Sequence, residues 1–183
     1  MLYIMRHGRT DWNDLRKLQG RTDIPLNEEG RAQAKAAAEE IRDLHLDICF
    51  VSPLQRATET AQILLAGRDI PIVQDDRLKE MCFGIYEGVE NSFQIPDCPV
   101  NQLFQAPEEY KVPVEGGESL EELYARTGAF LKEQVYPLTE QGKDVLIVGH
   151  GAMNCSIICQ VRNIPVKDFW SAGIDNCKVI RLT

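Results

Sequence analysis

Residues 2–8 read Leu2-Tyr3-Ile4-Met5-Arg6-His7-Gly8, and residues 145–151 follow the same plan as Val145-Leu146-Ile147-Val148-Gly149-His150-Gly151. Each stretch is a short apolar run that ends at a histidine and a glycine. Such runs, bounded by glycine and polar residues, are typical of buried strands in a parallel sheet. Parallel sheets bind ligands at the carboxyl ends of their strands. We therefore expect His7 and His150 to meet in one pocket, although they lie far apart in the chain.

Between and after these stretches, the pattern alternates between helices and strands. Helices are expected over about residues 27–44, 52–66, 119–135 and 152–161, and further strands over residues 47–51, 70–74 and 177–182. Asn27 and Ser119 can cap two of the helices, and Ser52 followed by Pro53 is expected to cap a third. Pro71 indicates that the strand containing it lies near a sheet edge, or that the proline stands at its start. The alternation predicts an α/β fold around a mainly parallel sheet.

The stretch over residues 87–115 has a different character, with four prolines and no long periodic run. We expect it to be a short irregular lid inserted in a single domain that spans residues 1–183. Aromatic side chains favour an ordered lid, and they are Tyr86, Phe93, Phe104 and Tyr110. Two interpretations of these aromatics stay open: a small core beneath the lid, or a wall of the substrate site.

Composition excludes several classes of protein. The net charge of −8 argues against nucleic-acid binding, which requires a basic surface. No stretch approaches the roughly 18 apolar residues of a membrane span. The sequence reaches Arg6 after five residues, which leaves no room for the apolar part of a signal peptide, so we expect a cytoplasmic protein. An acidic surface also repels anions, so a phosphate group would need a locally basic pocket.

Six cysteines raise the question of disulfides or a metal site. Several of them lie in apolar surroundings, so we interpret them as buried free thiols. No C-x-x-C pair occurs, and His45 stands alone at a helix end. We therefore expect no metal site.

Two arginines accompany the two histidines. Arg6 directly precedes His7, and Arg56 falls in the first turn of the helix expected after Ser52. Guanidinium groups match phosphate oxygens in pairs, and helix N-termini add backbone N–H donors. The residues therefore predict a phosphate site.

The same residues suggest phosphoryl transfer. A neutral imidazole is a competent nucleophile, and flanking guanidinium groups favour the neutral form. The second histidine would stabilise the charge that shifts during transfer. Glu80 is the best-placed proton donor, and its pKa is expected to rise beside a phosphate.

With these residues the chain resembles the histidine phosphatase superfamily, the family of cofactor-dependent phosphoglycerate mutases and related phosphatases. The resemblance covers nearly the whole chain, and its motifs occur in order. They are Arg6-His7-Gly8-Arg9-Thr10, Asn13, Gln19-Gly20, Asp23-Ile24-Pro25-Leu26, Ser52-Pro53-Leu54-Gln55-Arg56-Ala57, Glu80 with Phe83-Gly84, Gly116-Gly117-Glu118-Ser119 and Gly149-His150-Gly151.

The resemblance implies a fold and a set of roles. The fold would be a three-layer α/β/α sandwich. His7 would form a phosphohistidine, Glu80 would donate the proton, and no metal or other cofactor is implied. By the resemblance, Arg6, Arg56 and His150 would hold the phosphoryl group, and Asn13 and the Gly151 backbone would assist. Thr10, Gln19 and Gly20 are further candidate contacts to the substrate. Thr10 and Gln19 could equally brace a loop, and Arg9 is interpreted as a solvated charge at the rim.

Mutases and phosphatases of this family share the site. Mutases usually carry Glu where this chain has Arg9, basic residues after the acid, and arginines in a longer insert. Here Met81 and Cys82 follow Glu80, and residues 87–115 hold one lysine and six acidic residues. We therefore expect a phosphomonoester hydrolase for a small phosphorylated metabolite with a neutral, apolar or cationic leaving alcohol. The alternatives are a phosphoglycerate mutase and a non-catalytic phosphate-binding regulatory module, and a homodimer is left open.

Overall fold

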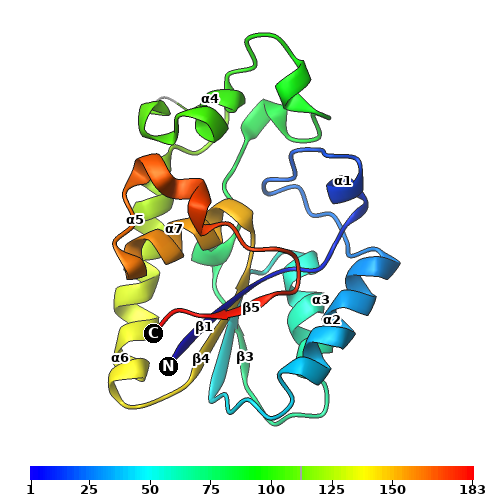
Figure 1. The fold of residues 1–183 in the computed structure, drawn as a ribbon, viewed down its shortest axis with the longest axis vertical. Coiled ribbons are helices and arrows are strands. Elements are labelled where there is room, and N and C mark those ends of the chain that lie inside the picture. The colour runs from blue at the N-terminus through cyan, green and yellow to red at the C-terminus, as the bar shows by residue number, and fades with distance from the viewer. Residues whose placement is uncertain (112) are drawn as a thin grey trace.

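The computed structural model describes residues 1–111 and 113–183, and one five-stranded sheet forms its centre (Figure 1). The strands are β1 (Leu2–Arg6), β2 (Ile48–Val51), β3 (Ile72–Gln74), β4 (Val145–Gly149) and β5 (Val179–Arg181), and their spatial order is β3-β2-β4-β1-β5. The first four run parallel, and β5 pairs with β1 in the antiparallel direction. The predicted α/β fold with a mainly parallel sheet is confirmed, and Pro71 directly precedes the edge strand β3.

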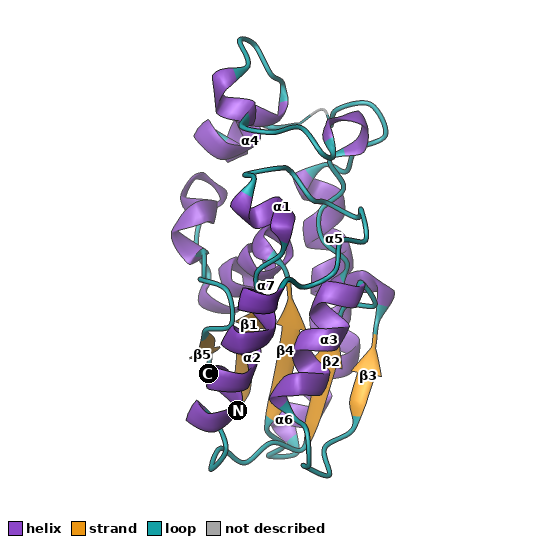
Figure 2. Cartoon of the chain, turned by 90° about the vertical axis from the view of Figure 1, so that its right-hand side faces the viewer, coloured by secondary structure: helices purple, strands orange, loops and turns teal. Residues whose placement is uncertain are grey.

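Helices cover both faces of the sheet (Figure 2). The helices of the described residues are α1 (Asp11–Asp14), α2 (Glu28–Glu40), α3 (Gln55–Leu64), α4 (Val100–Gln105), α5 (Leu120–Phe130), α6 (Tyr136–Glu140) and α7 (Gly151–Arg162), of which α1 and α4 lie beyond the carboxyl end of the sheet. Helices α2 and α3 lie on one face, and α5, α6 and α7 lie on the other (Figure 1). A π-helical turn over Leu131–Val135 joins α5 to α6. The expected three-layer sandwich is confirmed.

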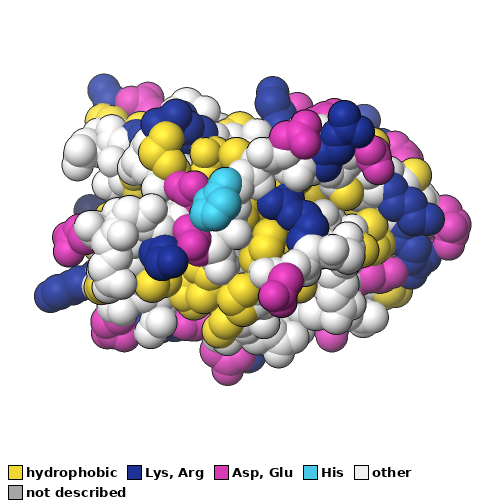
Figure 3. Space-filling view, turned by 90° about the horizontal axis from the view of Figure 1, so that it is seen from below, with side chains coloured by type: hydrophobic (Ala, Val, Ile, Leu, Met, Phe, Trp, Pro, Cys, Tyr) yellow, Lys and Arg dark blue, Asp and Glu magenta, His cyan; other side chains and the backbone are white. Residues whose placement is uncertain are grey.

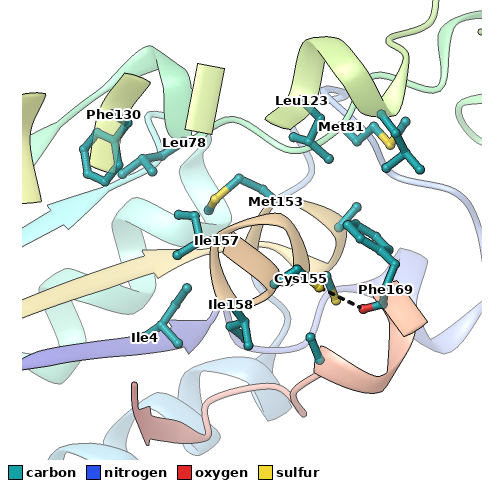
Figure 4. Packing of buried hydrophobic residues seen from close by; sticks show 14 of the residues in the cluster. Ile4, Leu78, Met81, Leu123, Phe130, Met153, Cys155, Ile157, Ile158 and Phe169 are labelled. Atoms are coloured by element: carbon teal, nitrogen blue, oxygen red, sulfur yellow. Dashed lines mark hydrogen bonds between the residues drawn. The ribbon is translucent and has the colours of Figure 1, made fainter. Parts of the chain in front are cut away.

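The alternation of strand side chains divides the core in two. Ile4 and Ile147 face α5 and α7, where they pack in one cluster with Phe130 (Figure 4). Met5 and Val148, their neighbours in sequence, face the small alanines of α2 and α3. Burying one such side chain contributes about 1.5–3 kcal/mol. The strands are apolar on both sides because both faces of the sheet are covered.

Two predicted helix caps are confirmed. The Asn27 side chain accepts the backbone N–H of Gly30 at 2.9 Å, and α2 begins at the next residue, Glu28. Ser119 forms a capping box with Glu122 at the start of α5. Helix α2 ends at Glu40, a turn earlier than expected.

The predicted cap of α3 was wrong. The helix begins at Gln55 with Leu54 as its N-cap, so Ser52 lies in the turn that leads to it. The backbone N–H of Gln55 donates instead to the carboxylate of Asp23, at 2.8 Å. The Asp23 side chain, from a distant loop, therefore caps α3, a role that the local sequence pattern assigns to Ser52.

Residues 87–111 and 113–115 lie above the carboxyl end of the sheet (Figure 1). Residue 112 of the predicted lid falls outside the described residues. The rest is less irregular than expected, because it contains α4 and two short 3₁₀ turns, Ser92–Gln94 and Pro107–Glu109. Tyr110 is buried, whereas Phe93 is largely exposed. Tyr110 belongs to the same apolar cluster as Ile4 and Phe130, so the lid packs onto the main core.

All six cysteines are free, and five of them are buried, as predicted. Among the described residues, none of the helices has the length and apolar character needed to cross a membrane.

The opposite end of the sheet carries a network of charges. The prediction that His45 stands alone was wrong, because its Nδ1 lies 3.2 Å from an Asp144 carboxylate oxygen and near Asp47. Figure 3 shows a histidine between acidic side chains on this face. Asp47 also binds Lys143, and Asp144 binds the N-terminal amine. The backbone N–H of Asp144 and the Lys143 amine lower the pKa of the Asp47 carboxyl group, and the N-terminal amine and His45 lower that of Asp144. The carboxylates already have cationic partners here, so the cluster serves to tie strand ends together.

Candidate active site

The two histidines meet because β1 and β4 are neighbours in register. Arg6 pairs with Gly149 at the ends of these strands, and the backbone N–H of His7 donates to the Gly149 carbonyl at 2.9 Å. The rings of His7 and His150 follow directly, with their centroids 5.2 Å apart. The strand-end argument from sequence thus brings both imidazoles to one place.

The protonation of His7 follows from its hydrogen bond. Its Nδ1 lies 2.6 Å from the carbonyl oxygen of Gly8. A carbonyl oxygen only accepts, so Nδ1 carries the proton and Nε2 keeps its lone pair. Burial, together with the charges of Arg56 and Arg6, lowers the pKa of His7 well below 6.5. His7 is therefore a neutral imidazole with an unprotonated Nε2 at neutral pH.

Arg56 is the largest fully buried side chain of the chain, and two backbone carbonyls hold it. Its Nη1 donates to the Thr22 carbonyl at 2.8 Å, and its Nη2 donates to the Gly20 carbonyl at 2.7 Å. Burial lowers its pKa to about 10, while the charges of Glu80, Asp23 and Glu87 oppose the shift. The guanidinium group stays charged at neutral pH, so it is a fixed cation at the floor of the site.

Arg6 reaches the same cavity as His7, although the two are neighbours in sequence. This is possible because β1 ends at Arg6 and the chain turns at Gly8. The Nε atoms of Arg6 and Arg56 are buried, and neither has a hydrogen-bond partner among the described residues. Two guanidinium groups beside a neutral imidazole suit a phosphoryl group.

Glu80 is buried beside the first turn of α7. One carboxylate oxygen accepts the backbone N–H groups of Met81 and Met153, at 2.8 and 2.9 Å, and the other accepts that of Ala152, at 3.1 Å. The helix N-terminus expected to help bind phosphate therefore binds the carboxylate of Glu80 with two of its first N–H groups. This fixes Glu80 at the edge of the cavity that His7 also lines.

The loop around α1 supplies one wall of the cavity. Asn13, Gln19 and Gly20 line it, as does Gly151 on the other side. Thr10 does not line the cavity, because it is fully buried and its hydroxyl group caps α1. That hydroxyl also donates to the Gln19 side chain at 2.9 Å. Thr10 thus braces the loop, which is the second of the two roles considered for it.

His150 is fully buried and lies behind the cavity surface. Its Nε2 is 2.7 Å from the hydroxyl oxygen of Ser52, and its Nδ1 has no partner in the described part of the chain. Burial lowers the pKa of His150 well below 6.5, and Arg56 adds to the effect. His150 is therefore neutral at neutral pH.

The outer wall of the cavity is apolar. Phe104 of the lid stacks on Trp170 with ring centroids 5.0 Å apart, and Phe83 lies 6.5 Å from Phe104. Leu18 and Ala152 complete this wall. Of the two interpretations of the lid aromatics, Phe104 supports the substrate wall.

Lys17 and Trp170 are among the cavity residues that sequence reasoning missed. Lys17 follows α1, and Trp170 lies in the 3₁₀ segment Val166–Ala172 after α7. Neither residue belongs to a periodic pattern, so no sequence signal marked them. Arg9 forms ion pairs with Asp14 and Glu29 and stays partly exposed, which agrees with its interpretation as a rim charge.

Comparisons with known proteins give the same family as the motifs. The family model described as "Histidine phosphatase superfamily (branch 1)" matches residues 2–183. Phosphoserine phosphatase 1 of Hydrogenobacter thermophilus is 31% identical over 96% of this chain and 82% of its own. A 2,3-bisphosphoglycerate-dependent phosphoglycerate mutase of Cytophaga hutchinsonii is 32% identical over 92% of this chain and 80% of its own. The solved structure of Bacillus stearothermophilus YhfR superposes with a TM-score of 0.87 at 32% identity, covering 97% of this chain and 88% of that one.

Proposed function

The chain belongs to the histidine phosphatase superfamily, branch 1, and from this premise we propose that it hydrolyses phosphomonoesters through a phosphohistidine at His7. One observation carries the proposal: three complementary groups line a single cavity. They are the unprotonated Nε2 of His7, the buried guanidinium group of Arg56 and the carboxyl group of Glu80.

In the first step, Nε2 of His7 attacks phosphorus while the bond from phosphorus to the leaving oxygen breaks. Arg6 and Arg56 hold the phosphoryl oxygens and neutralise their charge. A proton passes from Glu80 to the leaving oxygen as its bond to phosphorus breaks. The products of the step are a free alcohol and a phosphohistidine.

In the second step, water attacks the phosphohistidine. The Glu80 carboxylate takes a proton from this water, the bond between phosphorus and Nε2 breaks, and inorganic phosphate leaves. His7 and Glu80 return to their starting states. His150 donates a hydrogen bond to the transferring group in both steps.

Release of inorganic phosphate from p-nitrophenyl phosphate tests the nucleophile. We expect His7→Ala to abolish turnover, because no phosphohistidine can form. His45→Ala is the matched control, since this exposed histidine lies in the charge network at the opposite end of the sheet. Equal rates for wild type and His7→Ala would refute the mechanism, and no turnover by wild type on any of a panel of phosphomonoesters would favour a phosphate-binding module.

The choice of leaving group tests the proton donor. Removing a general acid slows a reaction by about 10²–10⁴-fold when the leaving group needs a proton. We expect Glu80→Gln to cause such a loss with an alkyl phosphate. The loss should be much smaller in the first step with p-nitrophenyl phosphate, because p-nitrophenolate leaves readily without a proton. Equal losses of the first-step rate with both substrates would show that Glu80 is not the acid.

The apolar wall supports a substrate class. Phe83, Phe104 and Trp170 favour a small phosphorylated metabolite whose alcohol carries an aromatic or apolar group. Lys17 adds a cation to the cavity lining, so an alcohol that also carries an anionic group is a further candidate. Trp170→Ala should raise KM for naphthyl phosphate by several-fold and leave KM for glycerol phosphate unchanged. Equal changes for both would refute an apolar contact at this residue.

Mutase activity is the second candidate, because a phosphoglycerate mutase is among the similar proteins. A mutase must hold a carboxylate while it moves the phosphoryl group. Besides Arg6 and Arg56, Lys17 is the one cation that lines the cavity within residues 1–111 and 113–183. We therefore expect hydrolysis to dominate. Interconversion of phosphoglycerate isomers that is faster than phosphate release would reverse this assignment.

Six free thiols support a reducing compartment, so we propose a cytoplasmic location. The homodimer considered from sequence stays a prediction, and light scattering on the purified chain tests it.

A further inference from the structure

Ser52 has no role in the mechanism above, yet it touches His150. It is fully buried at the end of β2. Its backbone N–H donates to the Val148 carbonyl of β4 at 3.2 Å, which ties the two strand ends together. Its hydroxyl oxygen lies 2.7 Å from Nε2 of His150. The sheet register therefore brings a hydroxyl group to the Nε2 edge of the second imidazole.

The hydrogen bonds of Ser52 decide which group donates. The backbone N–H of Leu54 donates to the Ser52 hydroxyl oxygen at 3.3 Å. The hydroxyl hydrogen then needs an acceptor, because a buried donor without one is costly. Among the described residues, Nε2 of His150 is the acceptor within reach. If His150 donated instead, the hydroxyl hydrogen of Ser52 would have no acceptor.

We propose that Ser52 is a positioning residue that holds His150 in the tautomer with its proton on Nδ1. This inference rests on the proposed function of the site. A neutral imidazole has one N–H, and an unprotonated Nδ1 would direct a lone pair at an anion. With Ser52 donating to Nε2, His150 instead offers Nδ1–H, its one unpartnered polar atom, to the phosphoryl group.

Two different neighbours, the Gly8 carbonyl and the Ser52 hydroxyl group, thereby give the two imidazoles different roles. The Gly8 carbonyl accepts from Nδ1 of His7 and leaves a lone pair on Nε2 for attack. The Ser52 hydroxyl donates to Nε2 of His150 and leaves an N–H on Nδ1 for binding. The site needs one nucleophile and one donor, and the hydrogen bonds distinguish the two histidines accordingly.

The direct test is ¹⁵N NMR of the full chain labelled at its three histidines, with the His150 signals identified by their loss in His150→Asn. In wild type at neutral pH we expect a protonated Nδ1 and an unprotonated Nε2 for His150. A protonated Nε2 would overturn the proposal, and this result needs no Ser52 variant. It would do so without touching the proposed function, which depends on turnover and on His7.

Kinetics provide the second readout. We expect Ser52→Ala to lower kcat about 5–10-fold, the loss that one neutral hydrogen bond represents, and to weaken inhibition by inorganic phosphate to a similar extent. Ser52→Thr, which keeps the hydroxyl group, should restore part of the loss. Thr58→Val is the matched control, because the Thr58 hydroxyl donates to the Ser52 carbonyl and not to His150. If Thr58→Val lowered kcat as much as Ser52→Ala, the loss would come from the turn at Ser52 and not from its bond to His150. That result would overturn the proposal.

Discussion

Gly30→Ala should damage both stability and catalysis, although alanine is the better helix former. Gly30 lies in the first turn of α2, directly against the loop that follows His7. A Cβ at this position would lie 2.7 Å from the backbone nitrogen of Arg9 and closer still to the Arg9 carbonyl oxygen, where ordinary contact begins at 3.4 Å. Both contacts are with backbone, which cannot turn aside as a flexible side chain can.

The magnitude follows from two opposing effects. Replacing glycine by alanine in a helix gains up to about 1 kcal/mol. Forcing a methyl group into a packed site costs about 1–3 kcal/mol or more. We expect the steric effect to win and the free energy of unfolding to fall by about 1–2 kcal/mol, which lowers Tm by roughly 2–8 °C in a chain of this size.

Catalysis should suffer more than stability. Arg9 follows Gly8, whose carbonyl oxygen holds Nδ1 of His7. A displacement of this loop moves the nucleophile, and a misplacement of about 1 Å can cost 10²-fold in rate. We therefore expect kcat/KM for p-nitrophenyl phosphate to fall by about 10–100-fold.

Gly128→Ala in α5 is the matched control. A Cβ there would meet only the far end of the flexible Gln160 side chain, at 2.6 Å. It has the same gain in helix propensity without a backbone clash, so its stability should be unchanged or higher and its activity normal. Urea unfolding followed by circular dichroism and steady-state kinetics measure both effects. If Gly30→Ala proved as stable and active as Gly128→Ala, the close packing of α2 against the catalytic loop would be refuted.

Three further predictions concern pH, the loop that holds Arg56 and metals. His7 and His150 have pKa values well below 6.5 in the folded chain, so the unfolded chain binds more protons below that pH. The free energy of unfolding should therefore fall as the pH is lowered from 6.5 to 5.5, by up to about 1.4 kcal/mol per pH unit for each histidine. A urea midpoint that rises as the pH is lowered over this range would contradict this prediction. The Glu87 carboxylate accepts three backbone N–H groups, two of them in the loop whose carbonyls hold Arg56. Glu87→Gln should therefore raise KM about tenfold, whereas Glu109→Gln, in an exposed part of the lid, should leave KM unchanged. Equal KM values for the two variants would show that Glu87 does not support the Arg56 site. Since guanidinium groups bind the phosphoryl group, turnover should be insensitive to EDTA, and activity that is lost on chelation and restored by zinc or magnesium would instead establish a metal requirement.

The site residues that the sequence predicts are those that follow directly on strands or come soon after them. His7 and His150 end two apolar runs, and the strand-end rule predicts that they meet, as the pairing of β1 with β4 shows. Arg56 and Glu80 follow the next two strands of the sheet, so the same rule applied to them. Buried parallel strands leave a strong pattern in the sequence because both of their faces must be apolar.

The parts that the sequence does not predict depend on contacts between loops. Trp170 and Lys17 reach the cavity from irregular segments, whose paths no periodicity encodes. Ser52 followed by Pro53 has the composition of a helix cap, yet Asp23 from a distant loop binds the first N–H of α3. The hydroxyl group of Ser52 is thereby left to bond with His150. A local sequence pattern indicates which nearby side chain can form a hydrogen bond. It cannot show that a residue far along the chain forms that hydrogen bond instead.

The central claim is that His7 carries the phosphoryl group, on Nε2, during turnover. Mass spectrometry of enzyme quenched at alkaline pH, with ³¹P NMR of the same sample, locates the covalent phosphate. We predict one phosphate on Nε2 of His7, because Nδ1 is engaged with the Gly8 carbonyl. The phosphate should be absent from His7→Ala. Phosphate on Nδ1 or on His150, or steady turnover in which no covalent phosphate can be trapped, would contradict the mechanism.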